Sequence, residues 1–257
     1  MVTATMPHRF AKNPFIVRLG VIALVLVIWE VAGRWLVDPM FFAPASRVGW
    51  DLASVFKTDG VPGAMGITLL ELVAAFALAV TAGLSIGLAV GLHTFSRRAF
   101  MPIILFLYGM PQVTILPIFV LCFGIGPACK IAFGFTHGVF PIIVTVAAGV
   151  QGIKPILLVG ARAMGASAWQ ELRYVVFPHL VPSLFTGMRL GMTGVLLGVL
   201  LAELYVSTAG IGFFTTQFTQ NFQPSLLLGL IGTLAAMAIV LNAVMRRLEA
   251  RFARWRD

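Results

Sequence analysis

Charge is scarce in this sequence, and its scarcity excludes most soluble folds. Only 11% of the 257 residues are Asp, Glu, Lys or Arg, whereas 60% are hydrophobic, against roughly 45–50% in soluble domains. Four long stretches have no charge at all, between Glu71 and Arg97, Arg98 and Lys130, Lys130 and Lys154, and Glu203 and Arg246. Each exceeds the about 20 residues that cross a bilayer. The sequence therefore predicts an integral membrane protein.

The sequence also lacks the usual signs of catalysis and of metal binding. It has no G-x-x-x-x-G-K-[ST] loop, so it cannot hold ATP in the P-loop manner. Its four histidines are far apart, and its two cysteines, Cys122 and Cys129, have no companions at metal-binding spacing. A G-x-S-x-G string at Gly83–Gly87 lies in the middle of an apolar run, not at a strand-to-helix turn. We therefore expect no catalytic residue, no metal and no cofactor in this chain.

The apolar runs predict an all-α membrane protein, because barrel strands would instead alternate with period two. We expect a single transmembrane domain over residues 1–257, with Ser207–Gln223 as a surface loop or short re-entrant turn. Turn signals divide the runs into six helices, at about Val17–Trp35, Thr68–Leu92, Phe100–Phe123, Lys130–Val150, Pro182–Leu204 and Pro224–Met245.

The basic residues predict the orientation. Fourteen of the eighteen Lys and Arg residues, including Arg9, Lys12, Arg254 and Arg256, lie on one side of the six helices. The positive-inside rule places that side, both termini and residues 151–181 in the cytoplasm. The other four lie outside: Arg34, Arg47, Lys57 and Lys130. This flanking role accounts for the net charge of +9, and we expect no nucleic-acid partner.

The first apolar run is expected to be a retained span and not a cleaved signal peptide. Glu30 follows its apolar core directly, and no clear small-residue cleavage site comes after it. Elsewhere, glycines recur on one helix face at Gly83, Gly87 and Gly91, and again at Gly187, Gly191, Gly194 and Gly198. Such spacing lets another helix approach closely, so we expect both faces to pack against other spans.

Residues 160–182, GARAMGASAWQELRYVVFPHLVP, are unusually polar for their place between two apolar halves. We expect a short amphipathic helix over Pro155–Met164 that breaks at Gly165. A second short helix is expected over Ala168–Tyr174, with Ser167 as its N-cap.

The end of this polar stretch carries its own signals. Glu171 lies near the first turn of the second helix, where the dipole favours a carboxylate. Pro178 and Pro182 are expected to end the segment and to restart the chain as the fifth span. Two short helices held at a fixed angle form a docking element on the cytoplasmic face. An ordinary solvated loop of a secondary transporter is the alternative.

The polar stretch resembles the cytoplasmic loop signature of binding-protein-dependent ABC importer permeases. That signature runs Glu-Ala-Ala, three residues, Gly, nine residues, an aliphatic residue, any residue, Leu-Pro. Here Gly165 is followed after nine residues by Val175-x-Phe177-Pro178. The first three positions read Val159-Gly160-Ala161, so the name-giving Glu is absent, and Phe177 stands where Leu is usual.

The resemblance covers nearly the whole chain and is most similar to the nitrate/sulfonate/taurine/bicarbonate group. Its other matching segments are Trp29-Glu30, Phe42-Ala43-Pro44-Ala45, Leu116–Gly126, Phe140–Val150, Gly187–Gly191 and Ala202-Glu203. It implies a type I importer permease fold with both termini inside, in the bacterial inner membrane, for a small anion such as a sulfonate, nitrate, bicarbonate or carboxylate.

The resemblance also implies partners. These are a second permease, either another copy of this chain or a close relative, an extracytoplasmic solute-binding protein, and two cytoplasmic ATPases that bind the ATP and Mg, with membrane lipid around the helices. The polar stretch would couple to the ATPase over residues 161–174. Its coupling residues would be Arg162, Met164, Gly165, Ala166, Ser167, Trp169, Glu171 and Pro178.

Polar side chains within membrane spans are costly, so they are candidates for the solute pathway. The candidates are Gln112, Thr114, Thr136, His137, Thr193 and Glu203, and Glu71, Thr145 and Asn242 are also polar and lie within spans. For each Thr the alternative is a hydrogen bond to its own helix backbone, and for His137 it is a packing residue whose hydrogen bonds are satisfied. Two other functions stay open from the sequence. A secondary transporter would need no ATPase, and an intramembrane protease would need Ser85 and His137 at one depth.

Overall fold

The computed structural model describes residues 14–206 and 208–253, and every regular element in this part of the chain is helical. Arg9, Lys12, Arg254 and Arg256, on which part of the orientation rests, lie outside the described residues. The elements are α1 (Pro14–Val31), η2 (Ala32–Leu36), α2 (Ala45–Lys57), α3 (Val61–Leu92), α4 (Thr94–Gly109), η3 (Gln112–Ile115), α5 (Leu116–Phe123), α6 (Pro127–Gln151), α7 (Pro155–Ala163), α8 (Ala168–Glu171), η4 (Leu172–Val176), α9 (Phe177–Val206), α10 (Ile211–Gln220) and α11 (Pro224–Ala253).

Among the described residues, five helical stretches are long and apolar enough to cross a membrane. They are Pro14–Leu36, Val61–Leu92, Pro127–Gln151, Ala168–Val206 and Pro224–Phe252. A sixth crossing is obtained if α4 and the η3–α5 pair are counted as one bent span. The all-helical membrane fold expected from the apolar runs is confirmed.

The prediction of one continuous helix over Phe100–Phe123 is wrong. The chain bends by 87° between α4 and the η3–α5 segment. Pro111 explains the break, because proline has no N–H to donate and forces the residue before it out of the helical region. Met110 accordingly has φ −74° and ψ 148°, which is extended backbone.

Two further boundaries differ from expectation. The sequence predicts a surface loop or short re-entrant turn over the uncharged stretch Ser207–Gln223, but Ile211–Gln220 forms helix α10. Pro182 was expected to begin the fifth span, but α9 starts at Phe177 and continues through Pro182. The helix is continuous from Ala168 through η4 and α9 to Val206, so no separate short helix ends at Tyr174, and Pro178 lies in the first turn of α9 instead of ending the segment.

The described chain divides into two compact units. One contains the described residues up to Thr58 together with Gln217–Thr233, and the other contains Asp59–Thr216 and the chain from Leu234 onward. A single domain over residues 1–257 stays a prediction.

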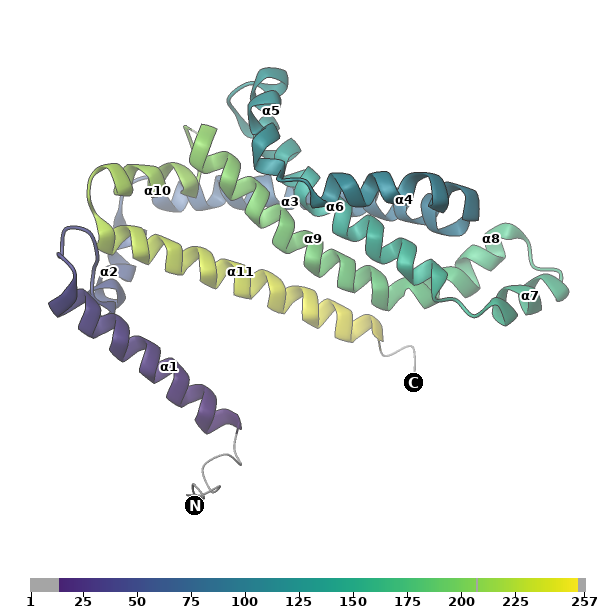
Figure 1. The fold of residues 1–257 in the computed structure, drawn as a ribbon, viewed down its shortest axis with the longest axis horizontal. Coiled ribbons are helices and arrows are strands. Elements are labelled where there is room, and N and C mark those ends of the chain that lie inside the picture. Colours follow the sequence, from purple (N-terminus) through teal and green to yellow (C-terminus); the bar gives the residue numbers. More distant parts are fainter. Residues whose placement is uncertain (1–13, 207, 254–257) are drawn as a thin grey trace, which may run out of the picture. The chain divides into compact units, whose positions relative to one another are not determined.

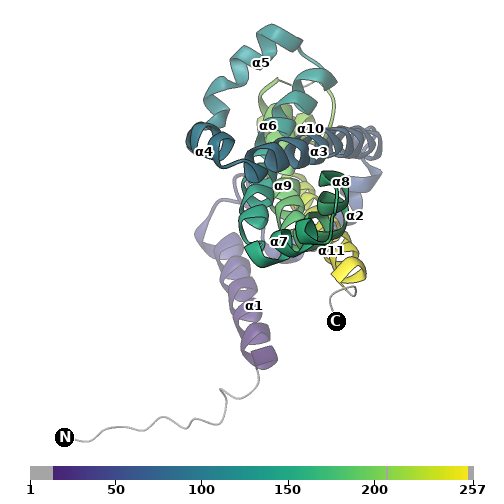
Figure 2. The same cartoon turned by 90° about the vertical axis from the view of Figure 1, so that its right-hand side faces the viewer.

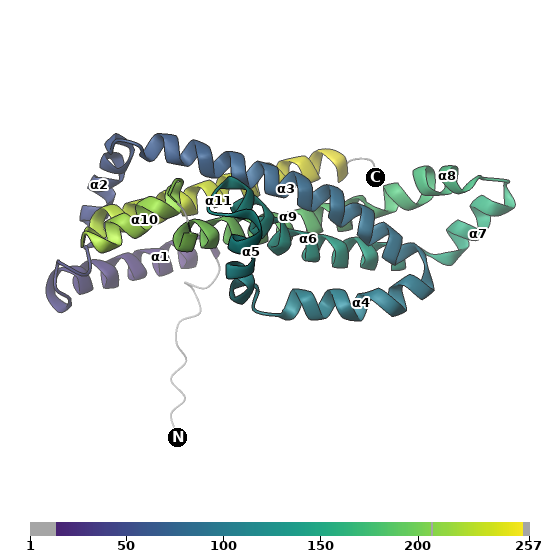
Figure 3. The ribbon, with the colours of Figure 1, turned by 90° about the horizontal axis from the view of Figure 1, so that it is seen from above.

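In the larger unit, α6 packs between α3 and α9 along most of its length (Figures 1 and 3). The glycines of α3 make close packing possible on one side. A Cβ added at Gly87 would lie 2.8 Å from Cβ of Val146, and one at Gly91 would lie 2.9 Å from Cβ of Val150. The expectation that this glycine face meets another span is confirmed.

The glycine face of α9 meets the other side of α6. A Cβ at Gly191 would lie 2.8 Å from the Ile142 side chain and 2.9 Å from the carbonyl oxygen of Gly138. At Gly194, an added Cβ would overlap the carbonyl oxygen of His137. This second expectation is also confirmed, and α3, α6 and α9 form one tightly packed three-helix core.

In the smaller unit, two segments that carried the family resemblance lie against each other. The indole Nε1 of Trp29 donates a hydrogen bond to the carbonyl oxygen of Ala43 at 3.0 Å. The carboxylate of Glu30 accepts hydrogen bonds from the backbone N–H and the hydroxyl of Ser46, at 2.9 and 2.7 Å. The end of the first helix and the start of α2 are thereby joined.

Candidate functional site

The segment α7–α8 connects α6 to α9 in the larger unit. Figure 1 shows it as a short hairpin beyond the ends of both helices, and in Figure 2, which is seen from that end, α7 and α8 lie in front of them. The chain reverses at Gly165, whose φ of +79° is in the left-handed region that favours glycine. No other atom lies within 4 Å of a Cβ built there, so the backbone angle alone requires glycine.

Helix α8 is short, but its start is fixed by a capping box. The backbone N–H of Gln170 donates to the Ser167 hydroxyl at 3.3 Å, and the Ser167 N–H donates to Oε1 of Gln170 at 2.8 Å. Two N–H groups that would otherwise lack helical partners are thus satisfied. The expected N-cap at Ser167 is confirmed.

A two-pronged ion pair closes the hairpin. Arg162 on α7 donates from Nε and Nη2 to the two carboxylate oxygens of Glu171 on α8, each at 2.9 Å. The hydrogen bond to Glu171 and the attraction between the two charges raise the pKa of Arg162 above its usual value. Paired contacts of this kind fix both distance and angle, so they hold α7 and α8 together.

The base of the hairpin is anchored by a small apolar cluster. Ile153, Val176 and Leu180 are buried together, with Leu158 of α7 and Leu172 packed against them. The hairpin is therefore joined to α6 and α9 by packed side chains as well as by the chain itself.

The hairpin exposes much of the rest of its surface. Met164 is 85% exposed and Trp169 67% exposed, while Ala166 is half-buried. Pro178 is exposed at the start of α9. The eight residues with expected coupling roles lie between α7 and the first turn of α9. Among them, Arg162, Gly165, Ser167 and Glu171 maintain the shape of the hairpin.

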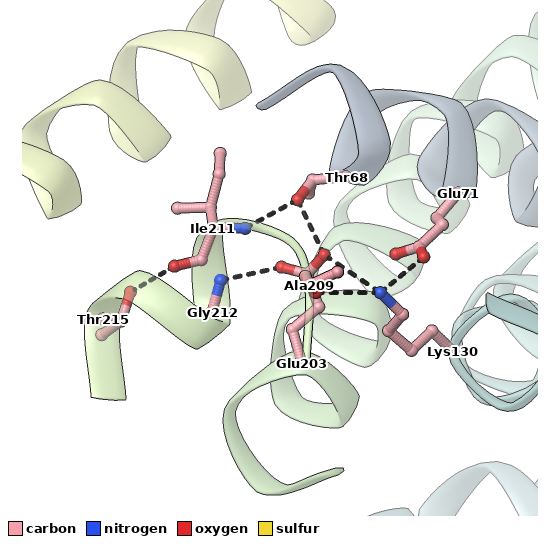
Figure 4. Close-up of polar contacts among 8 residues, drawn as sticks. All are labelled: Thr68, Glu71, Lys130, Glu203, Ala209, Ile211, Gly212 and Thr215. Carbon is pink, nitrogen blue, oxygen red and sulfur yellow. Dashed lines mark hydrogen bonds and ion pairs between the residues drawn. The ribbon is translucent and has the colours of Figure 1, made fainter. Parts of the chain in front are cut away.

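A second group of charges lies about 32 Å away along α6, at its other end. Figure 4 shows Lys130 of α6 between Glu71 of α3 and Glu203 of α9. Its Nζ lies 2.5 Å from Glu71 Oε1, 3.7 Å from Glu203 Oε1 and 3.1 Å from the carbonyl oxygen of Ala209. All three charged residues are at least 97% buried. We call Glu71, Lys130 and Glu203 the buried charge cluster.

The cluster also fixes the start of α10. Glu203 Oε2 accepts from the backbone N–H of Gly212 at 2.9 Å, and Oε1 accepts from the Thr68 hydroxyl at 2.7 Å. That hydroxyl in turn accepts from the N–H of Ile211 at 3.0 Å. Side chains from α3 and α9 thus satisfy the first N–H groups of α10, which explains why this polar stretch is helical.

The other pathway candidates differ in their hydrogen bonding. Thr114, Thr136 and Thr193 each donate to a carbonyl three or four residues earlier. His137 Nδ1 lies 3.0 Å from the Phe133 carbonyl oxygen.

Gln112, in contrast, is 91% buried at the break between α4 and α5, and its amide oxygen Oε1 accepts no hydrogen bond from any described residue. Most buried polar atoms have a partner. The other buried side-chain oxygens that accept no hydrogen bond among the described residues belong to Glu71, which is paired with Lys130, so Gln112 has no such compensation.

Sequence reasoning missed the buried charge cluster. Lys130 was expected to be an outside flanking charge, and Glu203 an isolated polar group in a span. A signal was available, because Glu71 begins one span, Lys130 begins another and Glu203 ends a third on the same predicted side. Charges within membrane spans pair with one another.

In residues 14–206 and 208–253, no three His, Cys, Asp or Glu side chains gather as a metal site.

Comparisons with known proteins bear on the whole chain. The family described as binding-protein-dependent transport system inner membrane component matches residues 79–256, more than half of the sequence. The taurine transport system permease protein TauC of Escherichia coli K12 is 29% identical over 243 residues, covering 92% of this chain and 88% of the relative. The nitrate import permease protein NrtB of Synechocystis is 27% identical over 217 residues, covering 81% and 78%.

Solved structures share the fold. A chain of the MetNI methionine ABC transporter, in an inward-facing conformation, is similar with a TM-score of 0.61 at 16% identity, over 81% of this chain and 99% of that chain. The expected type I importer permease fold is confirmed. The apolar helices and the family match show that the chain is a multi-pass protein of the bacterial inner membrane. It belongs to the inner membrane components of binding-protein-dependent transport systems.

Proposed function

We propose that this chain, with a second permease copy, forms the membrane pathway of an ATP-driven importer. A separate extracytoplasmic binding protein delivers a small anion, and two cytoplasmic ATPases power its passage. The observation that carries the proposal is the α7–α8 hairpin, a rigid and exposed element joined directly to two core helices. The relatives named for taurine and nitrate support an anion, since taurine carries a sulfonate.

The packing of the core suggests how force would travel. The ATPase would push on α7–α8, and the hairpin would pass the movement to the end of α6 and the start of α9. Because glycine contacts hold these helices together along their length, both would move with α3 as one body. The buried charge cluster would keep the far ends of the same helices together. Rigid-body rocking would then switch access between the two sides.

The orientation is part of this proposal. Both termini and α7–α8 would face the cytoplasm, as the bias of Lys and Arg residues indicates. The buried charge cluster would then lie at the extracytoplasmic end of the core. Labelling of cysteines with an impermeant reagent in intact cells tests this, because position 57 would react and position 154 would not.

Gln112 is the pathway residue we favour. Lys130 is fully engaged by Glu71 and Glu203, so it offers no free positive charge to a passing anion. Oε1 of Gln112 is buried without a hydrogen-bond donor where the helix is interrupted. Interrupted helices at membrane depth are tolerated where they are buried in protein or line a water-filled cavity. The amide oxygen cannot bind an anion, so the amide would donate to the oxygens of a sulfonate or nitrate through its Nε2–H groups. Gln112→Leu should lower the transport rate of the solute, while Thr114→Val, at a hydroxyl bonded to its own backbone, should not.

The experiment that tests the function as a whole uses Trp169. Trp169→Ala should leave membrane insertion intact but lower transport-coupled ATP hydrolysis by more than tenfold, since exposed aromatic anchors dominate many interfaces. Tenfold corresponds to about 1.4 kcal/mol of lost interaction. Trp50→Ala is the matched control, because Trp50 on α2 is 83% exposed but lies outside the hairpin.

Three results would contradict the proposal. The first is unchanged hydrolysis in Trp169→Ala, which would remove the hairpin from the coupling path. The second is an equal loss in Trp50→Ala, which would point to a general effect of removing surface tryptophans. The third is solute uptake by the purified chain in vesicles without any ATPase, which would instead favour a secondary transporter.

A further inference from the structure

The exposed side of the hairpin is apolar. Ile156 and Val159 lie three residues apart on the exposed face of α7, and they are 71% and 60% exposed. Met164, next to the turn, and Trp169, on α8, are 85% and 67% exposed. We call these four residues the apolar hairpin surface. Methionine and tryptophan are both favoured at protein interfaces.

The four residues of this surface are uncharged, and the exposed basic residues Lys154 and Arg173 lie just outside the hairpin at its two ends. From Pro155 to Leu172 the only charged residues are Arg162 and Glu171, and each satisfies the other in the two-pronged ion pair. The position of the family signature that normally carries Glu is Val159 here. A partner that covers the hairpin would therefore meet a methyl surface where a carboxylate is usual.

The surface is not explained by burial in lipid. Helix α6 has 25 residues, which at 1.5 Å each gives about 37 Å, already more than the about 30 Å of a hydrocarbon core. The hairpin follows the end of α6 and extends beyond it (Figures 1 and 3). Four large apolar side chains at this place would be exposed to water unless another protein covers them.

Resting on the proposed function, we propose that the partner ATPase receives the hairpin in an apolar cleft that presents no basic side chain at Val159. A cleft built with a basic residue for the usual carboxylate would leave that charge buried and unpaired against a valine, which is costly. The same mismatch would exclude the ATPases of other importers in the cell. Val159 would thus determine which ATPase this permease accepts.

The test measures binding of an ABC ATPase, encoded by a neighbouring gene and purified separately, to the full-length permease in nanodiscs. Val159→Glu should weaken binding at least tenfold, because it places a carboxylate in an apolar cleft. Val159→Ile should bind like the wild type. The control is Leu157→Glu, which adds the same charge on a different face of α7, where Leu157 is 48% exposed.

The outcomes separate this inference from the function on which it rests. Equal or tighter binding by Val159→Glu, with a wild type that binds, would overturn the apolar cleft and leave the importer function standing. Failure of the wild type to bind any such ATPase would overturn both. Brominated lipid quenches the fluorescence of tryptophans that it contacts. If part of the quenching seen in the wild type is lost in Trp169→Phe, the membrane covers this surface and the inference is overturned.

Discussion

The buried charge cluster and the Arg162–Glu171 pair use the same chemistry at opposite ends of α6. In the cluster, Lys130 is held between two carboxylates from different helices, and all three groups are buried. In the hairpin, the Arg162 side chain is 67% exposed, and its partner is nine residues away in the sequence. Burial decides what each pair contributes. A buried charge that loses its partner is costly, whereas an exposed pair contributes little to stability.

The difference matches the roles we assign to the two ends. The cluster joins α3, α6, α9 and the start of α10, so it maintains the helices as one body. The exposed pair sets the shape of a local hairpin and removes free charge from its surface. Four substitutions test this comparison, from the largest expected effect to the smallest.

Lys130→Met should cause the largest loss of stability. It leaves Glu71 and Glu203 buried together without their cation, which costs about 3–5 kcal/mol for a broken buried pair. We expect a much lower melting temperature in detergent and little folded protein. Lys57→Met, at an exposed lysine of α2, is the control and should be unaffected. The double variant Lys130→Met with Glu71→Leu should recover part of the loss, because Glu203 keeps its Gly212 and Thr68 partners. A single variant as stable as the wild type would refute the role of the cluster.

Gly191→Leu should come next, because the new side chain would collide with Ile142 and with the backbone of Gly138. Overpacking a core costs typically about 1–3 kcal/mol, and more where backbone must move. The yield of monodisperse protein on size exclusion should fall. Gly66→Leu is the matched control, since no atom lies within 4 Å of a Cβ at Gly66 on α3. Normal yield in Gly191→Leu would indicate that α6 and α9 are not packed through this face.

Gly165→Leu should have a smaller and more specific effect. A residue other than glycine in the left-handed region costs about 1–2 kcal/mol, and open space around the position removes any clash. The hairpin should become distorted while the helical core remains folded, so ATPase binding should fall about 5–30-fold with an unchanged melting temperature. Gly160→Leu, on α7 at an equally open position without positive φ, should bind nearly as well as the wild type. Equal losses of binding at both positions would show that the positive φ of Gly165 is not the cause of the effect.

Arg162→Gln should have the smallest effect on stability. The pair is exposed, so its loss should leave the melting temperature of the membrane core unchanged. Arg162→Gln should instead weaken ATPase binding, because it leaves the Glu171 carboxylate unpaired beside the apolar hairpin surface. The double variant Arg162→Gln with Glu171→Gln should recover part of the binding, because it has no free carboxylate there. A drop in melting temperature like that of Lys130→Met would show that burial does not separate the two charge groups.

Much of the fold could be predicted because membrane insertion depends on local composition. Apolar runs longer than a bilayer core must form helices, since lipid offers no hydrogen bonds to the backbone. Glycine periodicity identified the packed faces of α3 and α9. The hairpin was also readable from nearby residues, because Gly165 and the Ser167 cap act through backbone within a few positions of themselves.

The sequence by itself determined the membrane class, the helical hairpin and the family resemblance, which depend on local chemistry. Only the tertiary structure decided which charges meet, because Glu71, Lys130 and Glu203 come from three helices far apart in the chain. It also decided that α10 is a helix, since Thr68 and Glu203 supply the partners for its first N–H groups from elsewhere. The tertiary structure also decided that Gln112 is buried with its amide oxygen unpartnered. Pro111 predicts a break in the helix, but the burial of Gln112 depends on how other helices pack around that break.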